Sequence, residues 1–261
     1  TFIQTEFGIK MPPGKKSMLE SRLNKRLRSL GMTSYKQYKD YLFSLKGLEI
    51  EMPHLMDAVT TNKTEFFRED KHFEVLAQEV LPAWLAEQGR GKPFMVWSAG
   101  CSTGEEVYSL AMVLAEFAAS NRGFGFEVLG TDISQEVLHK AKRGVYPERL
   151  SQGIPQDFCK KYLMRSTDRS KGLMRIVPEL RSKVAFRELN LIEDFSFREK
   201  MDVVFCRNVV IYFEWRVQEI LFQKLCSCIA KGGFLFIGHS ESLSGMDLPL
   251  EQSRPTVFRK L

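Results

Sequence analysis

The sequence predicts an α/β fold: a doubly wound, mostly parallel β-sheet preceded by an all-helical domain. Three observations predict it. Apolar runs at 94–100, 126–132 and 201–206 have the length of buried strands, and segments of helical length separate them. Strands that alternate with helices along a chain are typical of parallel sheets. The chain has 261 residues, which is enough for one large α/β domain and a smaller one. A basic stretch near the N-terminus marks a separate module.

This N-terminal module is predicted to be helical and to cover residues 1–69. Leucines recur at helical spacing in 17–30, and two further helices are expected in 33–46 and 49–60. Residues 10–46 contain ten Lys or Arg against two acidic residues, a local charge of +8, whereas the whole chain carries +6. The local charge predicts an acidic partner, either nucleic acid or a carboxylate-rich protein surface, unless it only solvates a helix face.

The second domain is predicted to cover residues 70–261 and to contain the sheet. It opens with an amphipathic helix at 70–88, which we expect to be capped by Asp70 and kinked at Pro82. The remaining elements follow in alternation, with helices at 103–120, 134–144 and about 214–230, and strands at 183–190, 232–239 and 256–261.

One stretch breaks the alternation. About 40 residues separate Gly144 from Lys183, where a short connection would suffice. Within it, 161–177 contains two apolar runs around a polar turn, which predicts a β-hairpin. We therefore expect a small antiparallel β-subdomain inserted at about 145–182.

The turn after the first strand, "SAGCSTGEE" at 98–106, is a candidate ligand site because doubly wound sheets bind ligands at the carboxyl ends of their strands. The following helix opens with Glu105 and Glu106. Two carboxylates there would repel a pyrophosphate, although they also suit the helix dipole. A ligand without phosphate and with positive charge is favoured, and S-adenosylmethionine fits. An ordinary helix start is the alternative.

Three further strand tips carry polar residues. Asp132 ends the second strand and is placed to accept hydrogen bonds from a ribose diol, or to cap the next helix. Asn190 ends another strand, and Arg207 and Asn208 interrupt the apolar run "FCRNVVIYF". Since burying an unpaired arginine is costly, this pattern indicates a strand tip that faces a ligand. Upstream, "TTNKTEFFRED" at 60–70 is either a linker or a further part of the site.

Several stretches together resemble the CheR-type chemotaxis receptor methyltransferases. They are "TTNKTEFFRE", "VWSAGCSTGEEVYSLAM", "GTDIS", "LNL", "FCRNVVIYF" and "GGFLFIGHSESL", in the family's order and spacing. The resemblance implies a class I methyltransferase fold, which is Rossmann-like. It also implies methyl transfer from S-adenosylmethionine to glutamate side chains of membrane chemoreceptors, which leaves S-adenosylhomocysteine as product.

The resemblance also implies site residues. Those expected to bind the cofactor are Asn62, Thr64, Arg68, Glu106, Asp132, Asn190, Leu191, Arg207 and Asn208. Arg68 and Tyr212 would lie nearest the transferred methyl group, and Arg22, Lys25 and Arg26 would face the receptor's acidic methylation region. In some relatives the inserted subdomain docks a peptide from the receptor's C-terminal end, and the hairpin here leaves that open.

Two other functions are kept as alternatives. Net basicity favours an RNA or DNA methyltransferase, but no motif for methylating base amines is present. A non-catalytic signalling adaptor that binds S-adenosylmethionine is the third possibility. The four histidines are dispersed, so no metal site is expected, and five scattered cysteines indicate a reducing cytoplasm. We expect a cytoplasmic monomer that neither inserts into the membrane nor binds nucleic acid.

Overall fold

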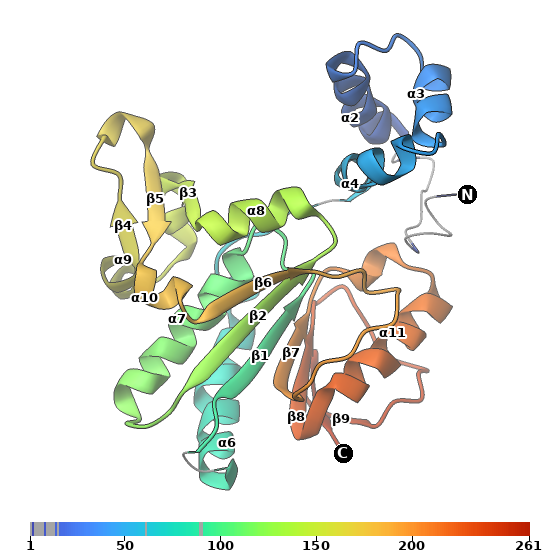
Figure 1. Cartoon of the computed structure of the whole chain (residues 1–261). Coiled ribbons are helices and arrows are strands. Elements are labelled where there is room, and N and C mark those ends of the chain that lie inside the picture. The colour runs from blue at the N-terminus through green and yellow to red at the C-terminus, as the bar shows by residue number, and fades with distance from the viewer. Residues whose placement is uncertain (1, 3–7, 9–13, 15, 61, 89–90) are drawn as a thin grey trace.

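The computed structural model describes residues 2, 8, 14, 16–60, 62–88 and 91–261. Its first part is a group of three helices, α2 (Lys16–Ser29), α3 (Tyr35–Leu42) and α4 (Gly47–Val59), which confirms the predicted helical domain (Figure 1). Leu27 of α2, Tyr38 and Leu42 of α3 and Leu55 of α4 are buried against one another. Each belongs to the apolar stripe of its helix, so burial of these stripes holds the three helices together.

The interior of this domain also contains one ion pair. The guanidinium of Arg26 donates to both carboxylate oxygens of Glu51, with nitrogen–oxygen distances of 3.0 and 2.6 Å. The Glu51 side chain is fully buried. Arg26 is therefore committed to the fold of this domain, because an unpaired buried carboxylate would be costly.

A seven-stranded sheet forms the second part, in the order β6-β2-β1-β7-β8-β10-β9. The first five strands in this order are parallel, and β10 and β9 are antiparallel to their neighbours. The strands are β1 (Phe94–Ala99), β2 (Phe126–Asp132), β6 (Val184–Glu188), β7 (Met201–Cys206), β8 (Ile229–Ile237), β9 (Leu250–Arg254) and β10 (Val257–Lys260). The chain reverses direction across the sheet between β1 and β7, the position where open α/β sheets bind ligands.

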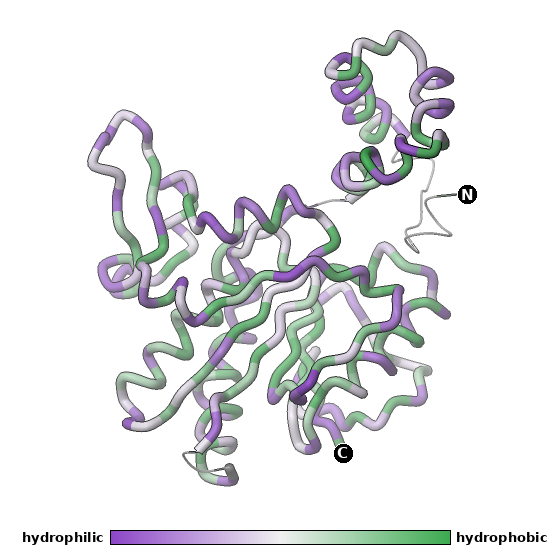
Figure 2. The backbone as a smooth tube through the Cα atoms, viewed as in Figure 1, coloured by the Kyte–Doolittle hydropathy of each residue, from purple (hydrophilic) through white to green (hydrophobic). Residues whose placement is uncertain are grey.

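Helices cover both faces of the sheet, as the doubly wound prediction requires. They are α7 (Glu105–Ser120), α8 (Gln135–Arg143) and α11 (Trp215–Cys228). Successive strand residues point to opposite faces. Val203 and Phe205 pack in one core with α7, whereas Val204 and Cys206 pack in the other with α11. Figure 2 shows the central strands as mainly apolar. Among the described residues, no helix combines the length and apolar character needed to cross a bilayer.

The helix predicted at 70–88 is divided into three pieces: α5 (Lys71–Val75), a π-helical turn η2 (Leu76–Val80) and α6 (Leu81–Gln88). The N–H of Leu81 bonds to the carbonyl of Leu76, five residues back. The π turn ends two residues before Pro82, which has no N–H for a regular helical bond. Asp70 is the N-cap residue of α5, as predicted, but its side chain makes no capping hydrogen bond.

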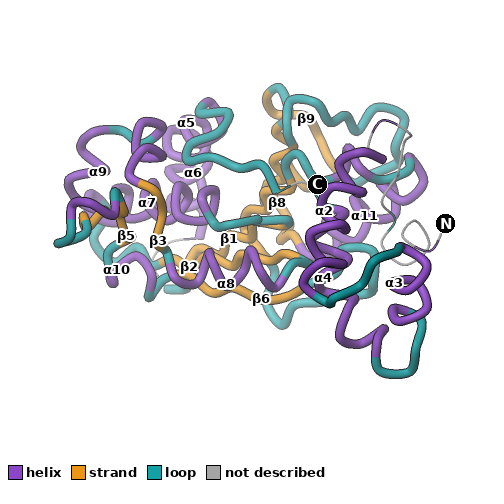
Figure 3. The backbone as a smooth tube through the Cα atoms, turned by 90° about the horizontal axis from the view of Figure 1, so that it is seen from above, coloured by secondary structure: helices purple, strands orange, loops and turns teal. Residues whose placement is uncertain are grey.

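The inserted antiparallel subdomain is present. Its sheet has the order β3-β5-β4, formed by β3 (Val145–Pro147), β4 (Leu163–Arg165) and β5 (Leu173–Ile176). The short helices α9 (Gln156–Tyr162) and α10 (Pro178–Arg181) and the 3-10 turns η3 (Glu148–Gly153) and η4 (Arg169–Lys171) complete it. The predicted hairpin is β4–β5, and β3 is an additional strand. In Figures 1 and 3 the subdomain and the N-terminal helices lie at opposite ends of the molecule.

Candidate functional site

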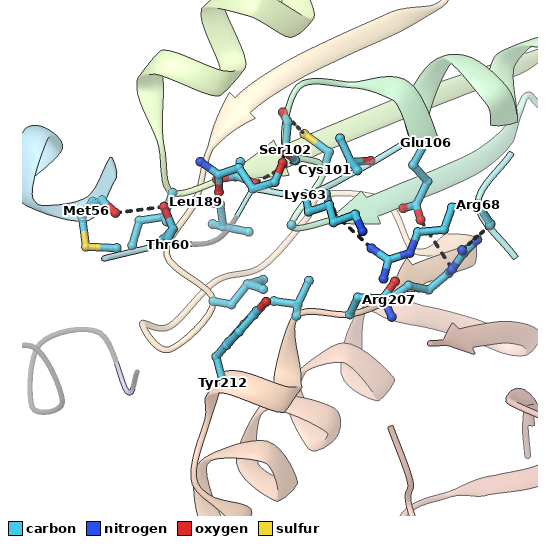
Figure 4. A pocket seen from close by; sticks show the side chains of 18 of the residues that line it. Met56, Thr60, Lys63, Arg68, Cys101, Ser102, Glu106, Leu189, Arg207 and Tyr212 are labelled. Carbon is cyan, nitrogen blue, oxygen red and sulfur yellow. Dashed lines mark hydrogen bonds and ion pairs between the residues drawn. The ribbon is translucent and has the colours of Figure 1, made fainter. Parts of the chain in front are cut away.

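A pocket lies at the carboxyl ends of β1, β2 and β7, between the sheet and the chain segment that follows α4. Figure 4 shows its side chains: Arg68, Glu106 and Arg207 lie together, and the ring of Tyr212 enters from a different wall. Every residue that the sequence predicts for cofactor contact lines this pocket, and so does Tyr212. Residues from five separate stretches of the chain are thus brought together.

The turn between β1 and α7 forms one wall. Gly104 has φ 93° and Ser102 has φ 49°, so the backbone turns sharply and Glu106 is placed at the pocket. Glu106 accepts a hydrogen bond from the Ser98 hydroxyl at 2.7 Å. Burial raises the pKa of the Glu106 carboxyl, and nearby Arg207 opposes that rise. Glu106 is therefore a mostly buried acceptor that lines the pocket.

Asp132 joins two turns. Its carboxylate accepts the N–H of Ser102 at 2.8 Å and the N–H of Ser134 at 3.0 Å. The helix cap of α8 is Ser134, whose hydroxyl accepts the N–H of Val137. Burial raises the pKa of the Asp132 carboxyl, and the backbone N–H groups around it lower it. Each oxygen keeps a further lone pair, so Asp132 can still accept from a ligand hydroxyl.

The surroundings of Arg207 explain why a charged side chain interrupts the apolar run "FCRNVVIYF". Its side chain is 1% exposed and lies between two carboxylates: Nη2 is 3.5 Å from Oε2 of Glu69, and Nε is 3.6 Å from Oε2 of Glu106. The guanidinium also donates to the carbonyl of Arg68 and lies over the ring of Phe73. The arginine is thus buried with counter-charges at the pocket wall, where the cost of desolvation is offset.

Glu241 is a structural residue of the site that the sequence prediction missed. One carboxylate oxygen accepts the N–H groups of Val209 and Val210, each at 2.9 Å, and the other accepts the N–H of Gly238 at 2.6 Å. It therefore ties the loop after β7 to the end of β8, and holds Asn208 with φ 58°. The one feature of the sequence that could have identified Glu241 is its position in "GHSESL", a stretch that contributed only to the family resemblance.

The segment 62–69 is packed against the sheet domain. Phe66 is buried in its core, and the N–H of Phe67 donates to the hydroxyl of Ser109 on α7 at 3.0 Å. The Arg68 guanidinium donates to the carbonyl of Lys63 at 3.2 Å. Asn62 and Thr64 also line the pocket. These contacts hold Arg68 beside the pocket opening rather than on a free linker.

The remaining predicted residues are placed as follows. Asn190 and Leu191 line the pocket beyond β6, and the side-chain oxygen of Asn190 accepts the N–H of Ile192. Tyr212 ends a single 3-10 turn, η5 (Val210–Tyr212), that follows the Arg207–Asn208 pair. Burial raises the pKa of the Cys101 and Cys206 thiols, as expected for cysteines that are not nucleophiles.

The three basic residues predicted to face a receptor do not behave alike. Arg22 donates to the backbone carbonyls of Ala58 and Thr60, and Arg26 pairs with Glu51. Both therefore hold α2 to α4. Lys25 alone of the three is exposed.

Comparison with known proteins places the chain in a family. Residues 62–258 match the family model described as CheR methyltransferase, SAM binding domain. Residues 1–60 match the model described as CheR methyltransferase, all-alpha domain.

Curated relatives are similar in sequence to this chain over nearly its whole length. A chemotaxis protein methyltransferase of Borreliella burgdorferi is 38% identical and covers 99% of this chain and 91% of the relative. The chemotaxis protein methyltransferase of Escherichia coli is 37% identical, with 96% and 85% covered. Chemotaxis protein methyltransferase 2 of Pseudomonas aeruginosa is 39% identical, with 90% and 81% covered. The chain therefore belongs to the CheR methyltransferase family and is an S-adenosylmethionine-dependent methyltransferase of chemotaxis.

Proposed function

We propose that this enzyme methylates glutamate side chains of membrane chemoreceptors, producing glutamate methyl esters and S-adenosylhomocysteine. The observation that carries the proposal is the pocket itself: the cofactor residues implied by the family line one cavity together with Arg68 and Tyr212. The family models and the names of the curated relatives support the link to chemotaxis.

The residues around the pocket fit S-adenosylmethionine. Glu106 and Asp132 offer carboxylate oxygens to a ligand with hydroxyl groups and positive charge, and the α7 N-terminus carries Glu105 and Glu106 rather than bare N–H groups for a phosphate. We assign Asp132 to the ribose diol and Arg68 to the cofactor carboxylate. Asn62, Thr64, Glu106, Asn190, Leu191, Arg207 and Asn208 complete the proposed cofactor contacts.

Bound S-adenosylmethionine supplies an electrophilic methyl group. The incoming glutamate is ionised at neutral pH, since an ordinary Glu has a pKa of about 4.3, so no protein base is needed. Arg68 and Tyr212 are proposed to orient the carboxylate in line with the methyl carbon and to exclude water from it. Reaction of an anion with a cation disperses charge, so a weakly polar site favours the transition state.

In this proposal, the helical domain of residues 1–69 contacts the receptor, and the domain of residues 70–261 transfers the methyl group. The second domain includes the inserted subdomain at about 145–182. The family models meet at residues 60–62, close to this boundary. Exposed basic residues of α2, Lys25 among them, would attract the acidic methylation region. We place the enzyme in the cytoplasm as a monomer. A second contact, between the subdomain and a receptor tail, is part of the same proposal.

Incubation with labelled S-adenosylmethionine and receptor-containing membranes tests the proposal. The expected product is labelled receptor from which mild base releases the label as methanol, because carboxyl esters hydrolyse readily. Label in added RNA or DNA would instead support a nucleic-acid methyltransferase. Tight binding of S-adenosylhomocysteine with no transfer to any receptor would support the adaptor alternative.

A further inference from the structure

A second cluster of chemistry-bearing side chains lies next to the pocket without lining it. Glu69 comes from the loop before α5, His72 from α5 itself and His239 from the turn after β8. One potential ligand atom from each residue lies within 4.8 Å of the other two. The two histidines are far apart in the chain, so their sequence spacing contains no metal motif.

The hydrogen bonds around Thr256 favour one tautomer of His72. The hydroxyl of Thr256 donates to the carbonyl of Pro255 at 2.6 Å, which uses its single proton. In the tautomer that this bond favours, Nε2 of His72, which lies 2.7 Å from the same hydroxyl oxygen, donates to it. The other ring nitrogen, Nδ1, then carries a lone pair and no proton.

This lone pair faces a carboxylate. Nδ1 of His72 lies 3.6 Å from Oε2 of Glu69, and the His72 side chain is 3% exposed. Both atoms are buried and lack a hydrogen-bond partner in the described part of the chain. Two facing acceptors are the arrangement that a bound cation would satisfy.

The third group opens the cluster to solvent. Nε2 of His239 lies 4.0 Å from Oε2 of Glu69, and the His239 side chain is 58% exposed. Its ring centroid is 5.3 Å from that of His72. An ion can therefore reach the buried pair past His239, and a small rotation of that exposed ring would complete the ligand set.

The charges nearby allow a cation. Arg207 lies close to Glu69, which would disfavour one, but it is shared with Glu106. The Arg207 guanidinium is therefore not committed to Glu69 alone.

We propose that Oε2 of Glu69, Nδ1 of His72 and Nε2 of His239 form a binding site for a divalent transition-metal ion of the Zn²⁺ class. Imidazole nitrogens suit such ions, whereas Mg²⁺ and Ca²⁺ prefer oxygen ligands. Tetrahedral Zn²⁺ with bonds of about 2.0–2.1 Å has ligand atoms roughly 3.4 Å apart. The separations of Glu69 Oε2 from the two imidazole nitrogens, 3.6 and 4.0 Å, are close to this value.

Titration of metal-free, cofactor-free protein with Zn²⁺ by calorimetry tests this site. The cofactor is left out because its amino acid end binds metals. The wild-type chain should bind one ion, and His239→Ala should weaken binding by at least about tenfold, since loss even of an outer-shell partner costs about 10- to 100-fold. His139→Ala is the matched control, because His139 is an exposed histidine on α8. It should bind like the wild type.

Co²⁺ absorption identifies the ligands independently. Histidine and carboxylate ligands give visible bands without the thiolate charge-transfer band that a cysteine site would show. Wild-type protein that binds no Zn²⁺ would overturn the proposal. So would equal binding by the His239→Ala and His139→Ala variants, or a thiolate band. Because the readout is binding without cofactor, its failure leaves the methyltransferase assignment unaffected.

Discussion

Arg207 and Glu106 lie side by side at the pocket wall, with Nε of the arginine 3.6 Å from Oε2 of the glutamate. The pair joins the end of β7 to the start of α7, the helix that follows β1. The strands β1 and β7 are distant in sequence and adjacent in the sheet order. Glu69 forms an ion pair with another nitrogen, Nη2, of the same guanidinium. The buried charge is therefore part of how the cofactor pocket is assembled.

Replacing Arg207 by Met should weaken both the fold and the pocket. Removal of one partner leaves buried carboxylates uncompensated, which typically costs about 3–5 kcal/mol. Urea unfolding should show this loss, and calorimetry should show weaker binding of S-adenosylhomocysteine. Arg198→Met, at an exposed position, is the control. Adding Glu106→Gln to the Arg207 variant should recover part of the stability, and no recovery would argue against the pairing.

Replacing Tyr212 by Phe should lower turnover and leave cofactor affinity nearly unchanged, because the hydroxyl is assigned to orienting the reacting carboxylate. Single-turnover methylation and binding of S-adenosylhomocysteine measure the two effects. Tyr162→Phe serves as control, since its hydroxyl donates to Glu116 in a different part of the structure. Normal turnover in the Tyr212 variant would remove this residue from the mechanism.

Glu241→Ala should destabilise the loop that presents Arg207 and Asn208. Three backbone N–H groups would lose their acceptor, and each buried unsatisfied group costs about 1–3 kcal/mol unless water replaces the carboxylate. Hydrogen exchange should rise at Val209, Val210 and Gly238 first. If exchange at these amides did not change, Glu241 would not be holding the loop.

Reversing the charge of Lys25 and Arg28, both exposed on α2, should reduce receptor methylation at low salt and leave cofactor affinity intact. The difference from wild type should shrink as salt screens the attraction. Lys231→Glu with Arg216→Glu supplies a control of equal charge outside the helical domain. Arg26→Glu is a poor test of docking, because it would place a carboxylate against the buried Glu51. Equal losses in the test and control pairs would point to net charge rather than to a receptor face.

Much of the fold was predictable because burial on both faces gives parallel strands continuous apolar runs. The strand at 126–132 has the predicted bounds, and the tips carrying Asp132, Arg207 and Asn208 meet at the pocket. The strand β9 was not predicted, since "LEQSR" at the sheet edge is mostly exposed and lacks an apolar pattern.

Other features depend on tertiary contacts that a single sequence does not display. Arg26 lies off the apolar stripe of α2, as a surface residue would, yet its guanidinium forms an ion pair with Glu51 of α4. Glu241 gives no local signal of the three N–H groups it accepts. The contact between Glu69 and His239 likewise joins residues that only the folded domain brings together.

The most direct test of the proposed activity is the location of the transferred methyl group on a receptor. A purified cytoplasmic receptor fragment, incubated with the enzyme and S-adenosylmethionine, would be digested and mapped by tandem mass spectrometry. The account predicts methyl esters on glutamate side chains of the helical region, abolished when those glutamates are replaced by Ala. Methylation on nitrogen or sulfur atoms, or none on the receptor while another substrate is modified, would contradict it.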